Sequence, residues 1–208
     1  REVGADVVVN AAAYTAVDRA EAEPELATRV NGEAPGVLAG EAARLGALLV
    51  HYSTDYVFDG SKPSPYVESD ATGPQSVYGR SKLAGEEAIR AAGGRSIIFR
   101  TSWVFGARGS NFARTILRLA QERETLAVVE DQVGSPTPAA LVATVTGIVL
   151  AMLRQGRAMA DDERRLYHLC CGRPVSWHEF ATTIVALAGA MPGLDLSLTP
   201  AAVRRIAT

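Results

Sequence analysis

Apolar residues in the first half of the chain fall into short continuous runs. The runs begin the stretches ADVVVNAAAYT (5–15), ALLVHYST (47–54) and SIIFRTSWVFG (96–106). A short apolar run without alternating polar positions is typical of a strand that is buried on both faces, as in a parallel sheet. We therefore predict three buried strands in these stretches.

Segments with helical spacing of apolar residues separate the three strands. We expect one helix to begin near Pro24 and to stop at Gly46, and a second to run from about Val77 to Ala92 after a long Gly-, Pro- and Ser-rich loop at 55–76. Strands that alternate with helices form a parallel sheet with helices on its faces. The predicted fold class is α/β, as part of a Rossmann-type, doubly wound parallel sheet.

The second half of the chain has a different pattern. An amphipathic helix is predicted at 110–124, and a second helix at 176–189 with Ser176 and Glu179 spaced as a capping box. Between them, the stretch 126–153 predicts a strand, a turn and a helix. Thr137 would be the N-cap of that helix and Pro138 its first residue.

These patterns suggest two parts with different roles. We assign residues 1–110 to the C-terminal part of a Rossmann-type cofactor domain that carries the catalytic motif. We assign residues 111–208 mainly to a smaller α+β substrate lobe, truncated and interleaved with the sheet. This lobe would supply one wall of a cleft.

Polar residues follow each predicted strand at its carboxyl end. They lie at positions 10–15, 53–55 and 101–103. Because ligands of parallel sheets bind beyond the carboxyl ends of the strands, we expect these residues to line one edge of a binding site. The plainer alternative is that strand ends are polar because loops follow them.

Tyr78 and Lys82 stand four residues apart on the second predicted helix, and Lys82 is one of only two lysines among 21 lysine and arginine residues. Residues at this spacing share a helix face. A nearby ammonium lowers the pKa of a tyrosine, which can then act as a general acid or base on a carbonyl or an alcohol. Thr54 could hydrogen-bond the same oxygen. The spacing by itself could also belong to an ordinary pair on a helix surface. Thr54 and the predicted parallel sheet favour a catalytic role for the pair.

Composition excludes several classes of partner. The net charge of −2 and the absence of a basic stripe argue against nucleic acid. The longest apolar run, 141–153, is too short to span a bilayer and predicts a buried helix. The adjacent Cys170 and Cys171 cannot form an ordinary disulfide with each other, and no Cys/His spacing indicates a metal site. We expect a reduced, cytoplasmic protein without a signal peptide, a membrane anchor or a metal.

Several longer motifs carry a family resemblance. In chain order they are VVNAAAYTAVDRAE, HYSTDYVFDG, VYGRSKLAGE, FRTSWVFG and DQVGSPT, between residues 7 and 137, and YHLCCG and SWHEFA extend the match to about residue 181. With Thr54, Tyr78 and Lys82, the chain resembles the extended short-chain dehydrogenase/reductase family, and within it the dTDP-4-dehydrorhamnose reductase branch.

The resemblance implies a reaction. NADPH or NADH would deliver hydride to the C4 ketone of dTDP-4-dehydro-L-rhamnose, which gives dTDP-L-rhamnose, a precursor of cell-surface polysaccharide. Tyr78 would donate the proton, Lys82 would lower the pKa of Tyr78 and bond the nicotinamide ribose, and Thr54 would polarise the carbonyl. The resemblance also implies binding residues: Ala12, Ala13, Tyr14 and Thr15 for the cofactor, and Asp55, Tyr56 and Trp103, with Thr54, for the sugar.

One expected feature has no match in the sequence. No Gly-rich turn connects a strand to a helix, although Rossmann folds hold the cofactor pyrophosphate on such a turn. The chain starts at Arg1 and runs directly into a strand. We expect a fragment that lacks one to two N-terminal βα units, on the order of 50 residues, and the C-terminal end of the substrate lobe. The choice between NADH and NADPH stays open, because the ribose-reading residue would lie in the missing part.

Two other functions remain as alternatives. The chain could belong to another sugar-nucleotide reductase or epimerase, or to a non-catalytic, cofactor-binding regulatory subunit. The complete Thr54–Tyr78–Lys82 set argues against the regulatory subunit, because a protein that only binds has no need of a tuned tyrosine. A homodimer is left open.

Overall fold

The computed structural model describes residues 4–156 and 165–208. The described residues form two compact units, each with its own hydrophobic core: residues 4–101 and 165–169 form unit 1, and residues 102–156 and 170–208 form unit 2. The functional division predicted at residue 110 stays a prediction.

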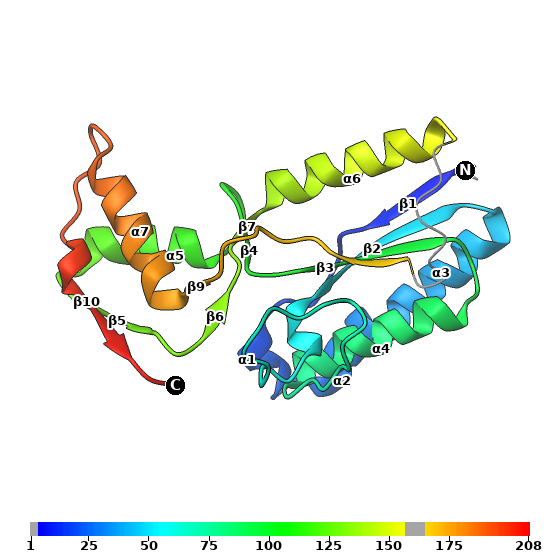
Figure 1. The fold of residues 1–208 in the computed structure, drawn as a ribbon, viewed down its shortest axis with the longest axis horizontal. Helices are drawn as coiled ribbons and strands as arrows, with labels where there is room; N and C mark the ends of the chain where they lie inside the picture. The colour runs from blue at the N-terminus through cyan, green and yellow to red at the C-terminus, as the bar shows by residue number, and fades with distance from the viewer. Residues whose placement is uncertain (1–3, 157–164) are drawn as a thin grey trace. The chain divides into compact units, whose positions relative to one another are not determined.

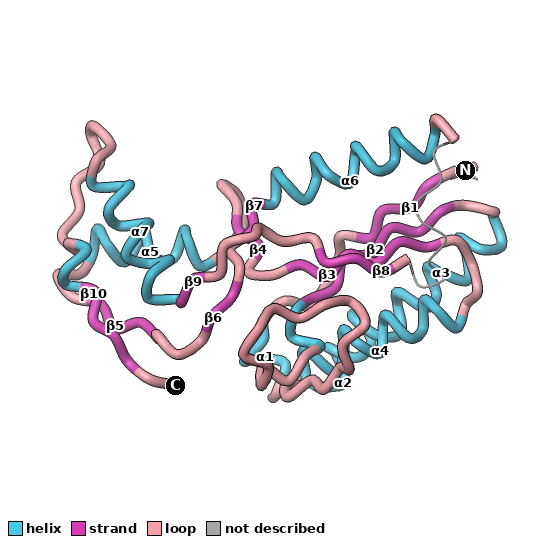
Figure 2. The backbone as a smooth tube through the Cα atoms, in the orientation of Figure 1, coloured by secondary structure: helices cyan, strands magenta, loops and turns pink. Residues whose placement is uncertain are grey.

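Unit 1 is built on a parallel sheet, which confirms the predicted α/β class (Figure 2). In spatial order its strands are β1 (Val7–Asn10), β2 (Leu48–Thr54), β3 (Ser96–Thr101) and β8 (Leu166–His168). All three pairings are parallel, with Asn10 opposite His51 and Thr54 opposite Thr101. The carboxyl ends of the strands therefore lie at one edge, as predicted.

The helices of unit 1 connect these strands. They are α1 (Val17–Ala20), α2 (Pro24–Thr28), the π-helical turn η1 (Arg29–Glu33), α3 (Ala34–Leu45), the 3₁₀ turn η2 (Asp55–Val57) and α4 (Val77–Ala91). α3 and α4 lie side by side against the sheet (Figure 1). The core between helices and sheet contains Leu49, Ile98 and Leu166 of the strands and Ala42 and Ile89 of the helices.

The helix predicted between Pro24 and Gly46 is continuous, but one turn of it is widened. Pro35 has no N–H to donate to the carbonyl of Asn31, and Ala34 N–H bonds the carbonyl of Arg29, five residues back. The widened turn presses the Asn31 carbonyl against Gly85 of α4, where a Cβ would collide with it. The sequence pattern predicted the helix and not its π turn.

Unit 2 combines helices with short paired strands, and its assignment as an α+β substrate lobe stays a prediction. Its helices are α5 (Phe112–Glu122), α6 (Ala139–Arg154), α7 (Trp177–Gly189) and the 3₁₀ turn η3 (Pro200–Ala202). Its strands pair two by two: β5 (Leu126–Val129) with β10 (Val203–Ile206), β4 (Val104–Phe105) with β7 (Thr137–Pro138), and β6 (Val133–Gly134) with β9 (Val175–Ser176). Ile116 of α5, Val185 of α7, and Val128 and Val203 of the β5–β10 pair form its core.

Three local predictions for this region are wrong. The strand predicted at 96–106 ends at Thr101, because Trp103 adopts a left-handed backbone conformation (φ 45°) that breaks the extended chain. Thr137 does not cap α6; it pairs in β7 and its hydroxyl donates to the Ser135 carbonyl (2.8 Å). Pro138 takes the N-cap position instead.

The apolar helix α6 is less buried than predicted. Val142 and Thr146 are its buried residues, whereas Ile148 is 54% exposed and Leu141 and Met152 are each 38% exposed. Within residues 4–156 and 165–208, only one narrow stripe of the helix is thus covered. None of the helices in the described ranges is both long and apolar enough to cross a membrane.

Candidate active site

Thr54 and Tyr78 meet at the carboxyl end of β2. Thr54 is the last residue of that strand and is buried, and its side chain shares a hydrogen bond with that of Tyr78 in the first turn of α4. The Thr54 hydroxyl also bonds Asp55 Oδ1 (3.0 Å) and accepts from Tyr56 N–H (3.2 Å). The β2 end and the start of α4 therefore hold the two hydroxyl groups together.

Two caps fix the start of α4 and so the position of Tyr78. Ser76 Oγ accepts from Gly79 N–H (3.1 Å), and the Glu21 carboxylate accepts from Val77 N–H (2.7 Å). The carboxylate also suits the positive end of the helix dipole. Glu21 lies 56 residues before the Val77 N–H that it caps.

Gly79 allows α4 to approach the loop after β2. A Cβ at this position would lie far inside contact distance of the Tyr56 carbonyl oxygen. The approach brings the rings of Tyr56 and Tyr78 edge to face, with centroids 5.6 Å apart at 80°. Three predicted site residues, Thr54, Tyr56 and Tyr78, are thus in mutual contact.

Lys82 lies one turn further along α4, with only 2% of the residue exposed. Its Nζ donates to the Tyr52 carbonyl (2.7 Å) and lies 3.3 Å from Nε2 of His51. Burial lowers the pKa of Lys82 to about 8, because it removes water from around the ammonium, while the Glu86 carboxylate acts in the opposite direction.

The pKa of Tyr78 is shifted upward, and the lowering expected from Lys82 stays a prediction. Burial raises the pKa of Tyr78 to about 12, and the hydrogen bond with Thr54 opposes this only in part. The physical reason is that loss of water around the phenolate outweighs the favourable contacts. The Lys82 amine is meanwhile bound to His51 and the Tyr52 carbonyl. At neutral pH, Tyr78 therefore holds its proton.

His51 is a fully buried residue of β2, and its ring contacts residues of β1 and α4. Its Nδ1 lies 3.1 Å from Asn10 Nδ2 at the end of β1, and its Nε2 faces Lys82. Burial, together with the charge of Lys82, lowers the pKa of His51 to about 3. The contact with Lys82 was missed from the sequence because it depends on the β1–β2–α4 packing.

The segment after β1 holds the residues predicted for the cofactor. Ala12 N–H donates to Asn10 Oδ1 (3.1 Å), while Ala13 is half-buried and Thr15 is exposed. The backbone of Tyr14 is held on both sides by Asn31, which accepts from Tyr14 N–H (2.8 Å) and donates to the Tyr14 carbonyl (2.9 Å). This segment is therefore held rigidly at the edge of the sheet.

Asn31 is a positioning residue that sequence reasoning missed. It is almost completely buried in η1, and it also donates to Ser81 Oγ on α4 (3.0 Å). The signal available was Pro35 inside a helical pattern, four residues later, which indicates a disturbed helical turn. Disturbed turns of this kind occur frequently at functional sites.

Trp103 belongs to unit 2, whereas the other predicted site residues belong to unit 1. Its indole stacks on that of Trp177 with centroids 3.4 Å apart and planes at 8°, and a Cβ at Gly134 would collide with it. A left-handed backbone at a bulky residue is costly and persists only when its surroundings enforce it. The structure shows how Trp103 is held; its contact with a sugar stays a prediction.

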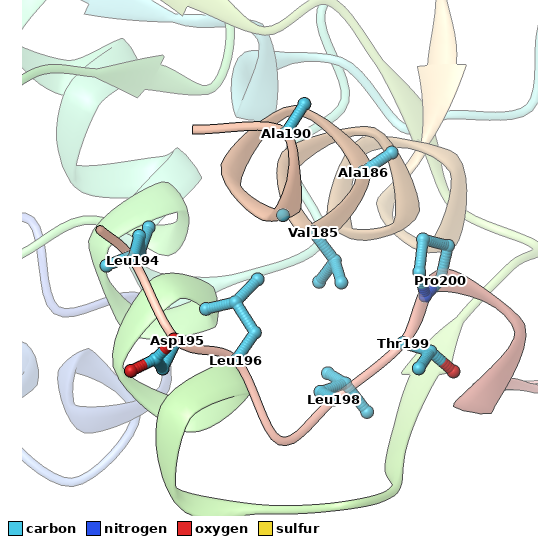
Figure 3. Close-up of a pocket in the computed structure, with 10 residues that line it drawn as sticks. Val185, Ala186, Ala190, Leu194, Asp195, Leu196, Leu198, Thr199 and Pro200 are labelled. Atoms are coloured by element: carbon cyan, nitrogen blue, oxygen red, sulfur yellow. The ribbon is translucent and has the colours of Figure 1, made fainter. Parts of the chain in front are cut away.

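A separate hollow of about 550 Å³ lies in unit 2, between α7 and the segment that follows it (Figure 3). Val185, Leu196 and Leu198 point toward one another there (Figure 3). The hollow is open to solvent. None of the residues predicted for catalysis or binding lines it. Among the described residues, no three His, Cys, Asp or Glu side chains gather in a way that could hold a metal ion.

Comparison with known proteins identifies the family. Residues 1–208 match the RmlD substrate binding domain. A dTDP-4-dehydrorhamnose reductase from Burkholderia thailandensis is 54% identical over 201 residues, which are 97% of this chain and 66% of that protein.

Several solved protein structures are similar to the structure of this chain as well. A dTDP-4-dehydrorhamnose reductase from Clostridium acetobutylicum has a TM-score of 0.83 and 37% identity, over 98% of this chain and 66% of that one. The Bacillus anthracis reductase, solved in complex with NADP, has a TM-score of 0.81 and 34% identity over the same shares. The chain thus spans just under two thirds of the length of these relatives. By its sequence and its fold, the chain belongs to the RmlD substrate binding domain family.

Proposed function

We propose that this chain carries the catalytic residues of an NADPH- or NADH-dependent reductase that converts dTDP-4-dehydro-L-rhamnose to dTDP-L-rhamnose. The observation that carries the proposal is the contact between Tyr78 and Thr54 at the carboxyl end of β2, with Lys82 one helical turn away. Two relatives named dTDP-4-dehydrorhamnose reductase, at 54% and 47% identity, support the choice of substrate.

The protonation state of Tyr78 suits the direction of the reaction. Reduction of a ketone needs a proton donor at the oxygen that becomes the alkoxide. Because burial raises its pKa to about 12, Tyr78 holds a proton at neutral pH and can give it to that oxygen. Thr54 donates a second hydrogen bond to the same oxygen and polarises the carbonyl, and the product leaves with one hydride and one proton added.

The segment after β1 fits the nicotinamide end of the cofactor. Residues 11–13 carry only methyl side chains, and the first two of them are exposed at the sheet edge, so a flat ring and its ribose can approach the backbone. Ala12, Ala13, Tyr14 and Thr15 would line this side, with Tyr78 and Lys82 opposite. When bound, the cofactor supplies the hydride.

The remaining assignments concern the sugar. Asp55 and Tyr56 adjoin Thr54 and would contact the hexose together with it. Trp103, held rigid by Trp177, would offer an aromatic face to the sugar or its nucleotide. A dTDP-sugar is thus the proposed partner.

The test follows the absorbance of the reduced nicotinamide with dTDP-4-dehydro-L-rhamnose as substrate. The chain is assayed alone and joined to the part of the Burkholderia relative that it does not cover. Tyr78→Phe should lose about 10²- to 10⁴-fold in rate while it still binds cofactor. Tyr66→Phe is the matched control, because it removes a hydroxyl that bonds Asp59 and not Thr54.

Two outcomes would overturn the proposal. If the joined protein and its Tyr78→Phe variant both bind cofactor and neither consumes it, the regulatory subunit is the better interpretation. If the protein copurifies with tightly bound NAD and interconverts epimers without net oxidation, it is an epimerase, because an epimerase keeps its cofactor through a full cycle.

A further inference from the structure

Three polar residues lie side by side across the sheet of unit 1, on the face toward α4. The strand register places Ser53 of β2 opposite Arg100 of β3, and Arg100 opposite His168 of β8. Arg100 binds Glu86 of α4 and so faces that helix. His51 also contacts α4, and Ser53, two residues further along β2, shares its face. We call Ser53, Arg100 and His168 the polar row.

The loop after β2 covers the polar row where it crosses β3 and β8. The guanidinium of Arg100 lies over the ring of Phe58, 5.0 Å from its centroid, and the ring of His168 meets Phe58 edge to face at 5.6 Å. The Glu68 carboxylate accepts from the His168 N–H (2.8 Å), and the imidazole forms a hydrogen bond with the Tyr66 backbone. Arg100 and His168 are therefore close neighbours beneath one aromatic ring.

Each residue of the polar row has one buried polar atom that other protein atoms do not satisfy. These atoms are Ser53 Oγ, Arg100 Nη1 and His168 Nε2, and within residues 4–156 and 165–208 none of them has a hydrogen-bond partner. Buried polar atoms are nearly always bonded to protein or to ordered water, because an unsatisfied one costs free energy. Three of them in one row indicate a bound polar ligand.

The ion pair with Glu86 determines what Arg100 can offer to that ligand. Glu86 takes the hydrogens of Arg100 Nε and Nη2, at 2.9 and 2.7 Å. These two nitrogens lie along one edge of the planar guanidinium, so Nη1 lies on the side away from the carboxylate. Arg100 Nη1 can only donate, and the ligand must therefore accept from it.

His168 offers the opposite role. Burial lowers the pKa of His168, so its ring is neutral at pH 7, while the hydrogen bond with the Tyr66 backbone acts in the other direction. A backbone group that favours the charged ring is a carbonyl, which accepts. Because Nε2 has no partner in the protein, Nδ1 donates this bond and carries the single proton. His168 Nε2 is then a lone pair, and the ligand must donate to it.

We propose that the polar row binds internal water, with one molecule that accepts a hydrogen bond from Arg100 Nη1 and donates one to His168 Nε2. Water has two hydrogens and two lone pairs, and the hydroxyl of Ser53 can bond to either kind of group. An anion such as chloride does not fit, because it cannot donate to Nε2 and would lie close to the carboxylates of Glu86 and Glu68. A cation is excluded by Arg100.

The bound water connects the last strand of unit 1 to the rest of the unit. β8 is three residues long and lies at the edge of the sheet, where its partner strand is β3. Through the water, His168 of β8 is joined to Arg100 and, by way of the ion pair, to α4. Water in such a position is a structural part of the fold. The site does not depend on the proposed reductase function.

A high-resolution crystal structure of the whole chain tests the site directly. We expect an ordered water within about 3.2 Å of both Arg100 Nη1 and His168 Nε2. A crystal soaked in sodium bromide should show no anomalous signal at this position. A bromide peak would identify an anion site, and a direct contact between the two nitrogens would leave no place for water. Either result would overturn the proposal.

Nuclear magnetic resonance tests the same arrangement in solution and needs no variant that could fail to fold. The chain has three histidines, so their ring signals can be resolved and assigned. At pH 7, a long-range ¹H–¹⁵N spectrum should show the His168 proton on Nδ1 and no proton on Nε2. A proton on Nε2 would contradict the proposal, because that nitrogen could not accept a hydrogen bond from water.

A matched pair of variants tests whether His168 holds the water. His168→Phe removes the acceptor, whereas His178→Phe removes a histidine of unit 2 whose Nε2 bonds the Val203 carbonyl. Relaxation dispersion of ¹⁷O in water counts the long-lived internal molecules, and the count should fall by about one in His168→Phe alone.

Two results with these variants would overturn the assignment. A folded His168→Phe chain that keeps all of its long-lived waters would show that His168 binds none of them. An equal loss in both variants would show that the effect is not specific to the polar row. A failed reductase assay would change none of these signals, so the two proposals fail separately.

Discussion

Glu86 and Arg100 form a bidentate ion pair in the interior of unit 1. Arg100 Nε and Nη2 lie 2.9 and 2.7 Å from the two carboxylate oxygens, and the side chains are 4% and 0% exposed. Arg90 approaches the same carboxylate at 3.2 Å. The pair connects α4, which carries Tyr78 and Lys82, to β3 of the sheet. We expect the position of α4 to depend on this pair.

Glu86→Gln should destabilise unit 1 strongly. The change leaves Arg100 as a buried charge without its counter-ion, and breaking a buried pair in this way costs about 3–5 kcal/mol. Glu87→Gln is the matched control, because the neighbouring glutamate is exposed. Urea unfolding should show a much lower midpoint for the first variant alone. Equal midpoints would mean that the pair contributes little.

Gly79→Ala should disturb the start of α4. The new methyl group would collide with the Tyr56 carbonyl, and the backbone would have to move, at a cost of about 1–3 kcal/mol. Because Tyr78 is the preceding residue, the reductase rate should fall as well.

Gly40→Ala provides the comparison for this variant. Gly40 is an exposed residue of α3 with open space around it, so alanine there should stabilise the helix by about 0.5–1 kcal/mol. Thermal or urea unfolding of both variants measures the contrast. A neutral Gly79→Ala variant would contradict the close approach of α4 to the loop after β2.

Acid should destabilise the chain partly through His51. Its pKa falls from 6.5 to about 3 on folding, so between these values the unfolded state binds more protons than the folded state. The free energy of unfolding therefore decreases as the pH falls below 6.5, by about 1.4 kcal/mol per pH unit from this group. By pH 4.5 the loss should reach about 3 kcal/mol.

His51→Gln isolates this contribution. Carboxylates titrate in the same pH range in both proteins. The contribution of His51 is therefore the difference between the two proteins in how steeply the free energy of unfolding falls between pH 6.5 and 4.5. Urea unfolding at several pH values gives that difference. Parallel curves for the two proteins would show that the histidine is not held neutral by burial.

Lys82→Arg should be harmful although the charge is conserved. The Lys82 side chain is almost completely buried, with its Nζ 3.3 Å from His51 Nε2 and 2.7 Å from the Tyr52 carbonyl, so a bulkier guanidinium would overpack the site and would stay charged there. We expect a loss of about 2 kcal/mol in stability and the loss of most reductase activity. Lys62→Arg, at the half-buried ion pair with Asp70, should be nearly neutral. Equal behaviour of the two variants would contradict a special role for Lys82.

The sequence by itself determined the parallel sheet of unit 1 and the residues at the carboxyl ends of its strands. Buried parallel strands appear as continuous apolar runs, and their carboxyl ends must lie at one edge. Tyr78 and Lys82 could be placed on one helix face because their spacing is local. Thr54, at the end of β2, was expected at the same edge for the same reason. Such features need no knowledge of distant contacts.

Only the tertiary structure decided features that depend on segments far apart in the chain. The turn at Trp103 is enforced by Trp177 and Gly134, and Thr137 pairs with the strand after that turn instead of capping a helix. The direction of the Tyr78 pKa shift is the balance between lost water and nearby charge, which the spacing of two residues cannot reveal. The contact of His51 with Lys82 arises because β1, β2 and α4 meet at one point. Local patterns thus determine which groups are present, and packing determines their partners and their charges.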